Sequence, residues 1–129
     1  MSSLVEKAKL EDASAIAELI NSNPEHLLPR DLDEIRQYID NFYCIRDNGK
    51  VVAVAAFEDY SPRIAEIRSL IVDAEHQGKG YGKLLVEELI KLATKDQEVF
   101  VVTSSVKFFT GLGFQHALKE REILFLRNK

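Results

Sequence analysis

The chain has 129 residues and a formal net charge of −4, with 46% hydrophobic and 29% charged residues. This length suits one domain around one core, so we expect a single domain over residues 1–129. No apolar run approaches the roughly 18–20 residues of a membrane span, no secretion signal is visible at the N-terminus, and no basic stripe is present that could bind a nucleic acid. The one cysteine, Cys44, allows no internal disulfide and favours a reducing, cytoplasmic location.

The first half of the chain predicts a strand, two helices and a hairpin. Residues 4–10 are typical of a short strand, and apolar residues at i, i+3, i+4 and i+7 predict an amphipathic helix over residues 11–23. After a loop with two prolines, a second helix is expected over residues 31–42, with Asp31 and Glu34 spaced as in a capping box. Asn48-Gly49 then predicts a two-residue hairpin turn. The apolar stripe of the second helix consists of Leu32, Ile35, Ile39 and Phe42.

The second half alternates strands and helices. Strands are expected over residues 63–72, 98–103 and 120–127, and helices over residues 81–95 and 105–114. The run at 98–103 is almost continuously apolar, which is typical of a strand covered on both faces. The helix at 81–95 is long enough for a crossover, so we expect the strands before and after it to be parallel. The fold class is therefore α/β, with one mixed central sheet.

Three glycines, Gly78, Gly80 and Gly82, stand at every second position where the helix at 81–95 begins. Their spacing does not match the dinucleotide-binding G-x-G-x-x-G pattern, and no Ser or Thr follows Lys83 as a phosphate-binding P-loop would require. Two interpretations stay open. The segment is either a helix N-terminus whose backbone N–H groups hold an anion, or a flexible turn that tolerates glycines.

The sequence around these glycines, SLIVDAEHQGKGYGKLLVEELIKLA, resembles the acetyl-CoA signature of the GNAT superfamily of N-acetyltransferases. In that signature, Q/R-x-x-G-x-G/A follows a strand and opens a helix, and Gln77, Gly80 and Gly82 stand at its marked positions. A second family landmark, KFFTGLGF, follows at residues 107–114. The resemblance implies the GNAT fold, with a mixed central sheet of about six to seven strands and about four helices. It also implies an N-acetyltransferase that uses acetyl-CoA as co-substrate.

By this resemblance, backbone amides at the helix start would hold the pyrophosphate of acetyl-CoA, and the end of the preceding strand would pair with its pantetheine arm. The glycines would then be present because a side chain would push the diphosphate off the amides. Lys79 and Lys83 would add charge, or else are solvated lysines at a helix start. The expected cofactor residues are Leu70, Ile71, Val72, Gln77, Gly78, Lys79, Gly80, Tyr81, Gly82 and Lys83.

The segments LLPRDLDEIRQYIDNF, AAFEDYSPRIAEIRSLIV and SSVKFFTGLGF are together similar to the acetyltransferase domain of N-acetylglutamate synthases. This similarity implies a small amine acceptor, such as the amino acid glutamate, whose carboxylate Arg30 helps to hold. Arg30 could instead be a loop arginine that covers a neighbouring helix, and Arg68 is a second expected substrate-binding residue. Acetylation of a protein lysine or N-terminus, a non-catalytic acyl-CoA-binding module, and a homodimer all stay open.

Two residues are expected to move protons. Glu66 lies within a strand, where a carboxylate is unexpected on burial grounds, and the resemblance implies a glutamate base at this position. Its alternative role is an ion pair with Arg68 on the same face of the strand. Many family members place a tyrosine acid where this chain has Phe109, which cannot donate a proton. The resemblance to the synthases implies Ser105, at the helix start, as the acid; a plain helix N-cap is its alternative role, and the two are compatible. The further candidate donors are Tyr60 and Tyr81.

The remaining candidates are expected to be structural. Cys44 is expected to be a small buried side chain. The three histidines, His26, His76 and His116, show no metal-ligand spacing, so no metal is expected. The phenylalanines of the C-terminal part are expected in the core rather than on a base-stacking surface. They are Phe108, Phe109, Phe114 and Phe125.

Overall fold

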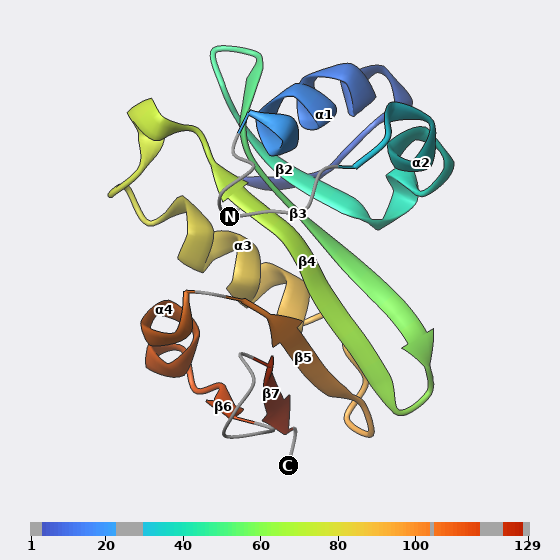
Figure 1. Ribbon diagram of the computed structural model, residues 1–129, viewed down its shortest axis with the longest axis vertical. Coiled ribbons are helices and arrows are strands. Elements are labelled where there is room, and N and C mark those ends of the chain that lie inside the picture. Colours follow the sequence, from blue (N-terminus) through green and yellow to red (C-terminus); the bar gives the residue numbers. More distant parts are fainter. Residues whose placement is uncertain (1–3, 23–29, 104, 117–122, 128–129) are drawn as a thin grey trace.

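The computed structural model describes residues 4–22, 30–103, 105–116 and 123–127, which form one seven-stranded sheet with four α-helices (Figure 1). The strand order is β1-β2-β3-β4-β5-β7-β6. The strands are β1 (Val5–Lys7), β2 (Phe42–Asp47), β3 (Lys50–Ser61), β4 (Ile64–Val72), β5 (Glu98–Val102), β6 (Gln115–His116) and β7 (Ile123–Arg127). The helices are α1 (Ala13–Asn21), α2 (Leu32–Gln37), α3 (Tyr81–Ile90) and α4 (Val106–Gly111). His26, most of the predicted loop at 24–30 and the side chains of His116 and Phe125 lie outside the described part.

The sheet is mixed, as the sequence predicts. β1 to β4 pair in antiparallel order, while β4 and β5 are parallel and are joined by α3, the expected crossover. The turn between β2 and β3 adopts the left-handed conformation expected of a tight hairpin, with φ of 52° at Asn48 and 79° at Gly49.

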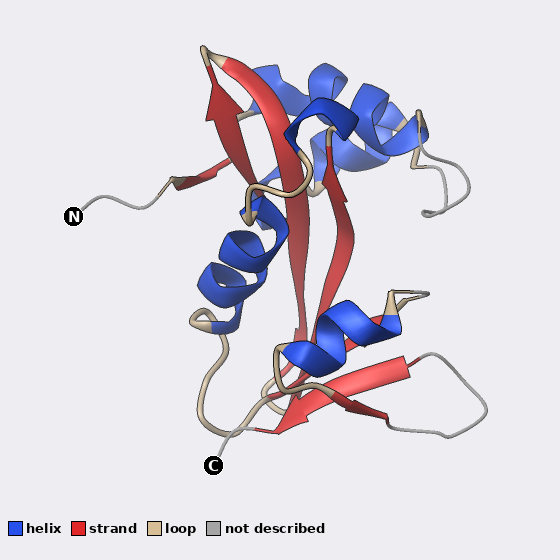
Figure 2. Ribbon diagram, turned by 90° about the vertical axis from the view of Figure 1, so that its left-hand side faces the viewer, coloured by secondary structure: helices blue, strands red, loops and turns tan. Residues whose placement is uncertain are grey.

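Helices cover both faces of the sheet (Figure 2). α1 and α2 lie on one face, where Ile16, Ile20 and Ile35 are fully buried together with residues of β2 and β3. α3 lies on the other face, where Leu85 and Leu89 are fully buried with residues of β3, β4 and β5. Because its centre is covered on both sides, β3 is continuously apolar from Val51 to Phe57, between Lys50 and the buried acid Glu58.

All four helices are shorter than predicted, and two of them end well before the predicted residue. The second predicted helix ends at Gln37, and Phe42 instead starts β2 opposite Ala56, because pairing in the sheet draws the chain into an extended conformation. α3 ends at Ile90, which leaves Leu92 exposed beyond the helix instead of on its buried face.

The capping box predicted at α2 is only half correct. The side chain of Asp31 caps the helix by accepting a hydrogen bond from the backbone N–H of Asp33 (3.4 Å). The carboxylate of Glu34 does not complete the box, because it accepts a hydrogen bond from Nε of Arg30 (3.3 Å). This side chain is therefore turned toward the sheet.

Two expectations about strands also change. β5 is not covered on both faces throughout, because Val102 is 63% exposed at its end. The sequence does not predict β6, since two residues carry no periodic pattern.

In β2, Cys44 is buried as expected, and burial raises the pKa of its thiol to about 11.

Candidate active site

β4 and β5 separate in the middle of the sheet. They pair from Ile64 to Glu66 on β4 and from Glu98 to Phe100 on β5, and within the described part of the chain the rest of β4 has no partner on that side. The gap opens into a cleft of about 710 Å³ that is also bordered by the end of β5 and by α4. The expected site residues that line it are Glu66, Arg68, Leu70, Ile71, Val72, Gln77, Gly82 and Ser105.

A bulge in β4 shapes this cleft. The register with β3 shifts between Arg68 and Ile71, so Ser69 and Leu70 face a single residue of β3. Ser69 has a φ of 58°, a left-handed conformation that a non-glycine residue rarely adopts. Bulges bend a strand and redirect its side chains, and no sequence pattern predicted this one.

The outer edge of β4 borders the cleft along Leu70, Ile71 and Val72. Unpaired N–H and C=O groups on such an edge can pair with an extended ligand as if it were an added strand. Gln77 donates a hydrogen bond from Nε2 to the carbonyl of Val72 (3.1 Å), so its side chain closes the turn after β4. The carbonyl of Val72, which the resemblance implied would pair with the pantetheine arm, therefore already accepts a hydrogen bond from Gln77.

The loop before α3 turns on two glycines in the left-handed conformation, with φ of 82° at Gly78 and 84° at Gly80. A Cβ atom at either position would meet nothing within 4 Å, so the backbone conformation, and not crowding by the protein, requires glycine there. Gly80 is the N-cap of α3 and has no side chain to bond the first N–H groups of the helix, which leaves these groups for a ligand. Lys79 and Lys83 are exposed beside them.

His76 fixes this loop against the β2–β3 hairpin. Its Nδ1 lies 3.0 Å from Oδ2 of Asp73, and its Nε2 lies 2.9 Å from Oδ2 of Asp47. The hydrogen bonds to Asp47 and then Asp73 raise the pKa of His76. The ring of Tyr81 stacks on His76 at a centroid distance of 6.3 Å, so Tyr81 packs against this arrangement. We call His76, Asp47 and Asp73 the histidine clamp.

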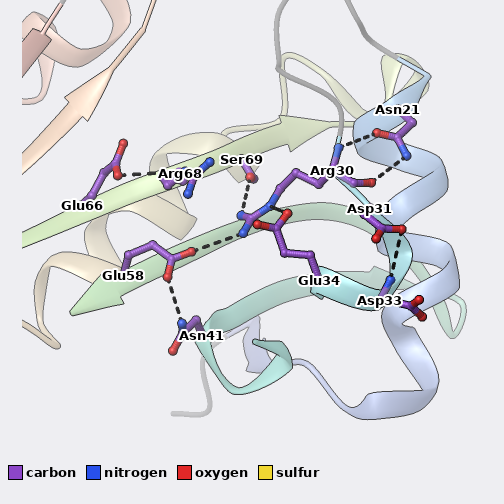
Figure 3. Close-up of polar contacts among 10 residues, drawn as sticks. All are labelled: Asn21, Arg30, Asp31, Asp33, Glu34, Asn41, Glu58, Glu66, Arg68 and Ser69. Carbon is purple, nitrogen blue, oxygen red and sulfur yellow. Dashed lines mark hydrogen bonds and ion pairs between the residues drawn. The ribbon is translucent and has the colours of Figure 1, made fainter. Parts of the chain in front are cut away.

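Glu66 lies where β4 leaves β5, buried in the wall of the cleft. Its Oε1 accepts a hydrogen bond from the Tyr60 hydroxyl (2.5 Å). The same oxygen lies 4.0 Å from Nε of Arg68, so the expected ion pair is present but long (Figure 3). Burial raises the pKa of Glu66, and the Tyr60 hydrogen bond and the Arg68 charge offset only part of this rise. A carboxylate with a raised pKa is suited to accept protons near neutral pH.

The residues of α4 present a hydroxyl and an aromatic wall to the cleft. Ser105 takes the N-cap position of α4, but its side chain makes no capping hydrogen bond, and the residue lines the cleft. Phe109 is buried, as expected, and packs edge-on against Phe114 at 5.3 Å. The expectation for Phe108 was wrong, because it is 36% exposed and borders the cleft, where a Cβ atom on Gly82 would lie 3.4 Å from its ring.

A second cavity, of about 420 Å³ and lined mainly by polar side chains, adjoins the cleft. We call it the polar pocket. Arg68 borders both cavities, and Tyr60 of the polar pocket bonds to Glu66 of the cleft. The polar pocket is lined by Arg30, Glu34, Tyr38, Asn41, Glu58, Asp59, Tyr60 and Arg68. Both expected substrate-binding residues, Arg30 and Arg68, therefore meet in one pocket.

Arg30 is 5% exposed and is surrounded by protein partners (Figure 3). Its Nε donates to Oε1 of Glu34 (3.3 Å), and its Nη1 donates to Oγ of Ser69 (3.0 Å). Its Nη2 lies 3.6 Å from Oε1 of Glu58, and the guanidinium lies over the ring of Phe42, 5.1 Å from the centroid. Arg30 therefore ties the start of α2 to the bulge of β4.

Sequence reasoning missed Glu58. This buried acid stands directly opposite Glu66 across β3 and β4, and its Oε2 accepts a hydrogen bond from Nδ2 of Asn41 (2.9 Å). Two like charges at opposite positions destabilise an ordinary sheet. In the sequence, the feature that could have marked Glu58 as a candidate site residue is its place as an acid directly after the apolar run of β3.

Within the described part of the chain, no group of three or more His, Cys, Asp or Glu side chains is placed to hold a metal ion. None of the helices described there is long and apolar enough to cross a membrane.

The central sheet splits between the parallel strands β4 and β5, next to the glycine-rich start of α3, which is the arrangement that the resemblance to the GNAT superfamily led us to expect. The family model for the acetyltransferase (GNAT) family matches residues 10–114. The chain therefore belongs to the GNAT family, as the resemblance implied, and is an N-acetyltransferase.

Two curated proteins are similar to the chain over most of its length. An uncharacterised N-acetyltransferase from Chlorobaculum tepidum is 35% identical over 120 residues, which are 90% of this chain and 77% of the relative. The amino-acid acetyltransferase of Mycobacterium tuberculosis is 30% identical over 117 residues, which are 86% of this chain and 67% of the relative.

Solved structures show the same fold. The Mycobacterium tuberculosis protein Rv2747, in complex with CoA and a second ligand, has a TM-score of 0.84 and 29% identity over 88% of this chain and 72% of its own. The N-acetylglutamate synthase of Neisseria gonorrhoeae, complexed with coenzyme A and N-acetyl-glutamate, has a TM-score of 0.85 at 23% identity. That match covers 97% of this chain and 35% of the synthase, and it concerns the fold alone.

Proposed function

We propose that the chain transfers the acetyl group of acetyl-CoA to the amine of a small acceptor, with an amino acid such as glutamate as the expected kind. The observation that carries this proposal is the junction of the two cavities at Arg68, with Glu66 on the cleft side and Tyr60 on the pocket side. The polar pocket, at about 420 Å³, is in the size range of small-molecule sites. The Mycobacterium tuberculosis relative named amino-acid acetyltransferase supports the same class of acceptor.

The cleft residues fit acetyl-CoA in three respects. The free edge of β4 at Leu70 and Ile71 offers backbone groups to the amides of a pantetheine arm. The uncapped start of α3 after Gly80 offers N–H groups and a positive dipole end to a diphosphate. Val102 and Phe108 supply exposed apolar surface on the other wall. Rv2747, solved with CoA, supports this assignment.

Glu66 is the proposed base. An α-amine has a reference pKa of about 8, so the acceptor arrives mostly as ammonium and must lose a proton before its nitrogen can attack the thioester carbonyl. The Glu66 carboxylate accepts that proton. The nitrogen then attacks the thioester carbonyl, and as the carbon–sulfur bond breaks the Ser105 hydroxyl gives a proton to the leaving sulfur. The extra proton on the attacking nitrogen is lost to solvent as the amide forms, and Ser105, which is exposed, recovers a proton from solvent.

Arg68 and Arg30 are the proposed partners of the acceptor's carboxylate. The side chain of Arg68 is 35% exposed and has Glu66 as a distant partner at 4.0 Å. The side chain of Arg30 is 4% exposed and lies against Glu34 and Glu58. A carboxylate can therefore reach Arg68 directly, whereas it reaches Arg30 by replacing Glu34. An arginine fork binds a carboxylate through two parallel hydrogen bonds.

Thiol release from acetyl-CoA tests this function across amino acids, polyamines and peptides with a free lysine or N-terminus. We expect release with an amino acid, and Arg68→Ala should raise the KM of that amino acid by about 10- to 100-fold, the range for a hydrogen bond to a charged group. The KM for acetyl-CoA should stay nearly constant. Arg36→Ala, which removes an exposed arginine of α2 outside both cavities, is the matched control. Release with peptides alone would instead indicate a protein acetyltransferase.

A further inference from the structure

Tyr60 occupies an irregular position near the end of β3. The register between β3 and β4 shifts between Asp59 and Ser61, which makes Tyr60 an extra residue in β3. Such a bulge redirects the side chain it carries. Here the Tyr60 hydroxyl reaches Oε1 of Glu66 at 2.5 Å.

The ring of Tyr60 contacts the neighbouring strand, β5. It packs against Phe100 of β5, with ring centroids 6.2 Å apart and planes inclined by 30°. Phe100 is the β5 residue paired with Glu66, in the last parallel pair before the two strands separate. Tyr60 thus contacts both strands at the point where the cleft begins.

The contacts of the Glu66 carboxylate are one-sided. Oε1 receives the hydrogen bond from Tyr60 and is also the oxygen nearest to Nε of Arg68. No residue of the described part donates a hydrogen bond to Oε2. Oε2 is therefore the oxygen left to accept a proton.

We propose that Tyr60 is the positioning residue of the base: its hydroxyl holds Oε1 of Glu66, so that Oε2 is presented to the acceptor amine, and Tyr60 keeps its own proton throughout. This inference rests on the proposed role of Glu66. In the step concerned, an N–H bond of the ammonium breaks, the proton passes to Oε2, and the electron pair stays on nitrogen. The O–H bond of Tyr60 does not break.

The groups that face Glu66 come from several elements. Burial is the largest cause of the raised pKa of Glu66, and the charge of Glu58 on β3 raises it further. Tyr60 on β3, Arg68 on β4 and Arg30 before α2 lower it. From β5 the apolar ring of Phe100 lies against Tyr60. Burial and the bond to Glu66 raise the pKa of Tyr60 to about 12, so the phenol stays protonated near neutral pH. Tyr60 is thus a donor that favours the charged form of Glu66.

Tyr60→Phe tests the inference because it removes the hydroxyl and keeps the ring. Glu66 loses a hydrogen bond to its charged form, so its pKa should rise by about one to two units. ¹³C NMR titration of the glutamate carboxyls measures this without any substrate, with the Glu66 signal assigned by its absence in Glu66→Gln. Tyr43→Phe, which removes a tyrosine hydroxyl from β2, should leave the Glu66 titration unmoved.

In turnover, Tyr60→Phe should move the acid limb of kcat to higher pH by the same amount, and it should lower the high-pH plateau of kcat only modestly, because the carboxylate stays in place but its Oε1 is no longer held. A Glu66 titration that does not move would overturn the inference. A kcat loss of about 100-fold at every pH would also overturn it, since that result would make Tyr60 a general acid. If the wild type releases no thiol with any amine, the proposed function fails, and the NMR titration still decides the role of Tyr60.

Discussion

Arg30 supplies the charge that balances Glu58 in the interior of the sheet. Within the described part, Oε1 of Glu58 has no hydrogen-bond donor and lies 3.6 Å from Nη2 of Arg30. Both residues are buried. Removing one partner of a buried ion pair leaves the other charge uncompensated, which costs more than the pair itself contributes.

Arg30→Ala should therefore lower the free energy of unfolding by about 3–5 kcal/mol, measured by urea denaturation. Adding Glu58→Gln removes the stranded charge, so the double variant should recover a large part of the loss. Arg36→Ala is the control, because its partner Asp33 is exposed and such pairs contribute about 0–1 kcal/mol. The same loss for Arg30→Ala with and without Glu58→Gln would contradict this account.

At the scale of elements, the loop before α3 depends on the left-handed backbone at Gly80. A residue with a Cβ atom pays about 1–2 kcal/mol to adopt that conformation. Gly80→Ala should lower the free energy of unfolding by about this amount and reduce the rise in Tm that acetyl-CoA produces. Gly111→Ala in α4, where φ is not positive and a Cβ atom meets nothing within 4 Å, is the matched control. An unchanged acetyl-CoA response in folded Gly80→Ala would disprove the loop's role in binding the diphosphate.

The histidine clamp joins the same loop to the β2–β3 hairpin, and its strength depends on pH. The hydrogen bonds to Asp47 and then Asp73 raise the folded-state pKa of His76 above its ordinary value of 6.5. The clamp therefore contributes its full stability below about pH 6.5 and loses it as pH rises through the raised pKa. Tm scans from acid to mildly alkaline pH should show this loss in the wild type and not in His76→Gln. The same decline in both proteins would argue against the clamp.

At the scale of the whole molecule, the sequence predicts what depends on local and periodic signals. The order of the long elements, the Asn48-Gly49 turn and the crossover each follow from patterns within one segment. The continuous motif from Gln77 to Lys83 likewise lies at the start of α3, as expected.

The features that escape sequence analysis depend on pairing between strands. The bulges at Tyr60 and Ser69, and the position of Glu58 opposite Glu66, exist because of the register between β3 and β4. A one-residue change of register redirects side chains, and no pattern within a single strand encodes it. Glu66 could be predicted as a candidate base, but its partner Tyr60 could not be assigned to it.

In the proposed reaction Glu66, at the separation of β4 and β5, removes a proton from an amine held in the polar pocket, and kcat measured against pH in Glu66→Gln tests this role most directly. Glutamine keeps the shape of the side chain but cannot accept the proton, so kcat at pH 7 should fall by about 10²–10⁴ while the KM for acetyl-CoA stays nearly constant. The loss should shrink as pH rises, because solution then supplies free amine. Near-wild-type turnover at pH 7 in a folded Glu66→Gln protein would contradict the account.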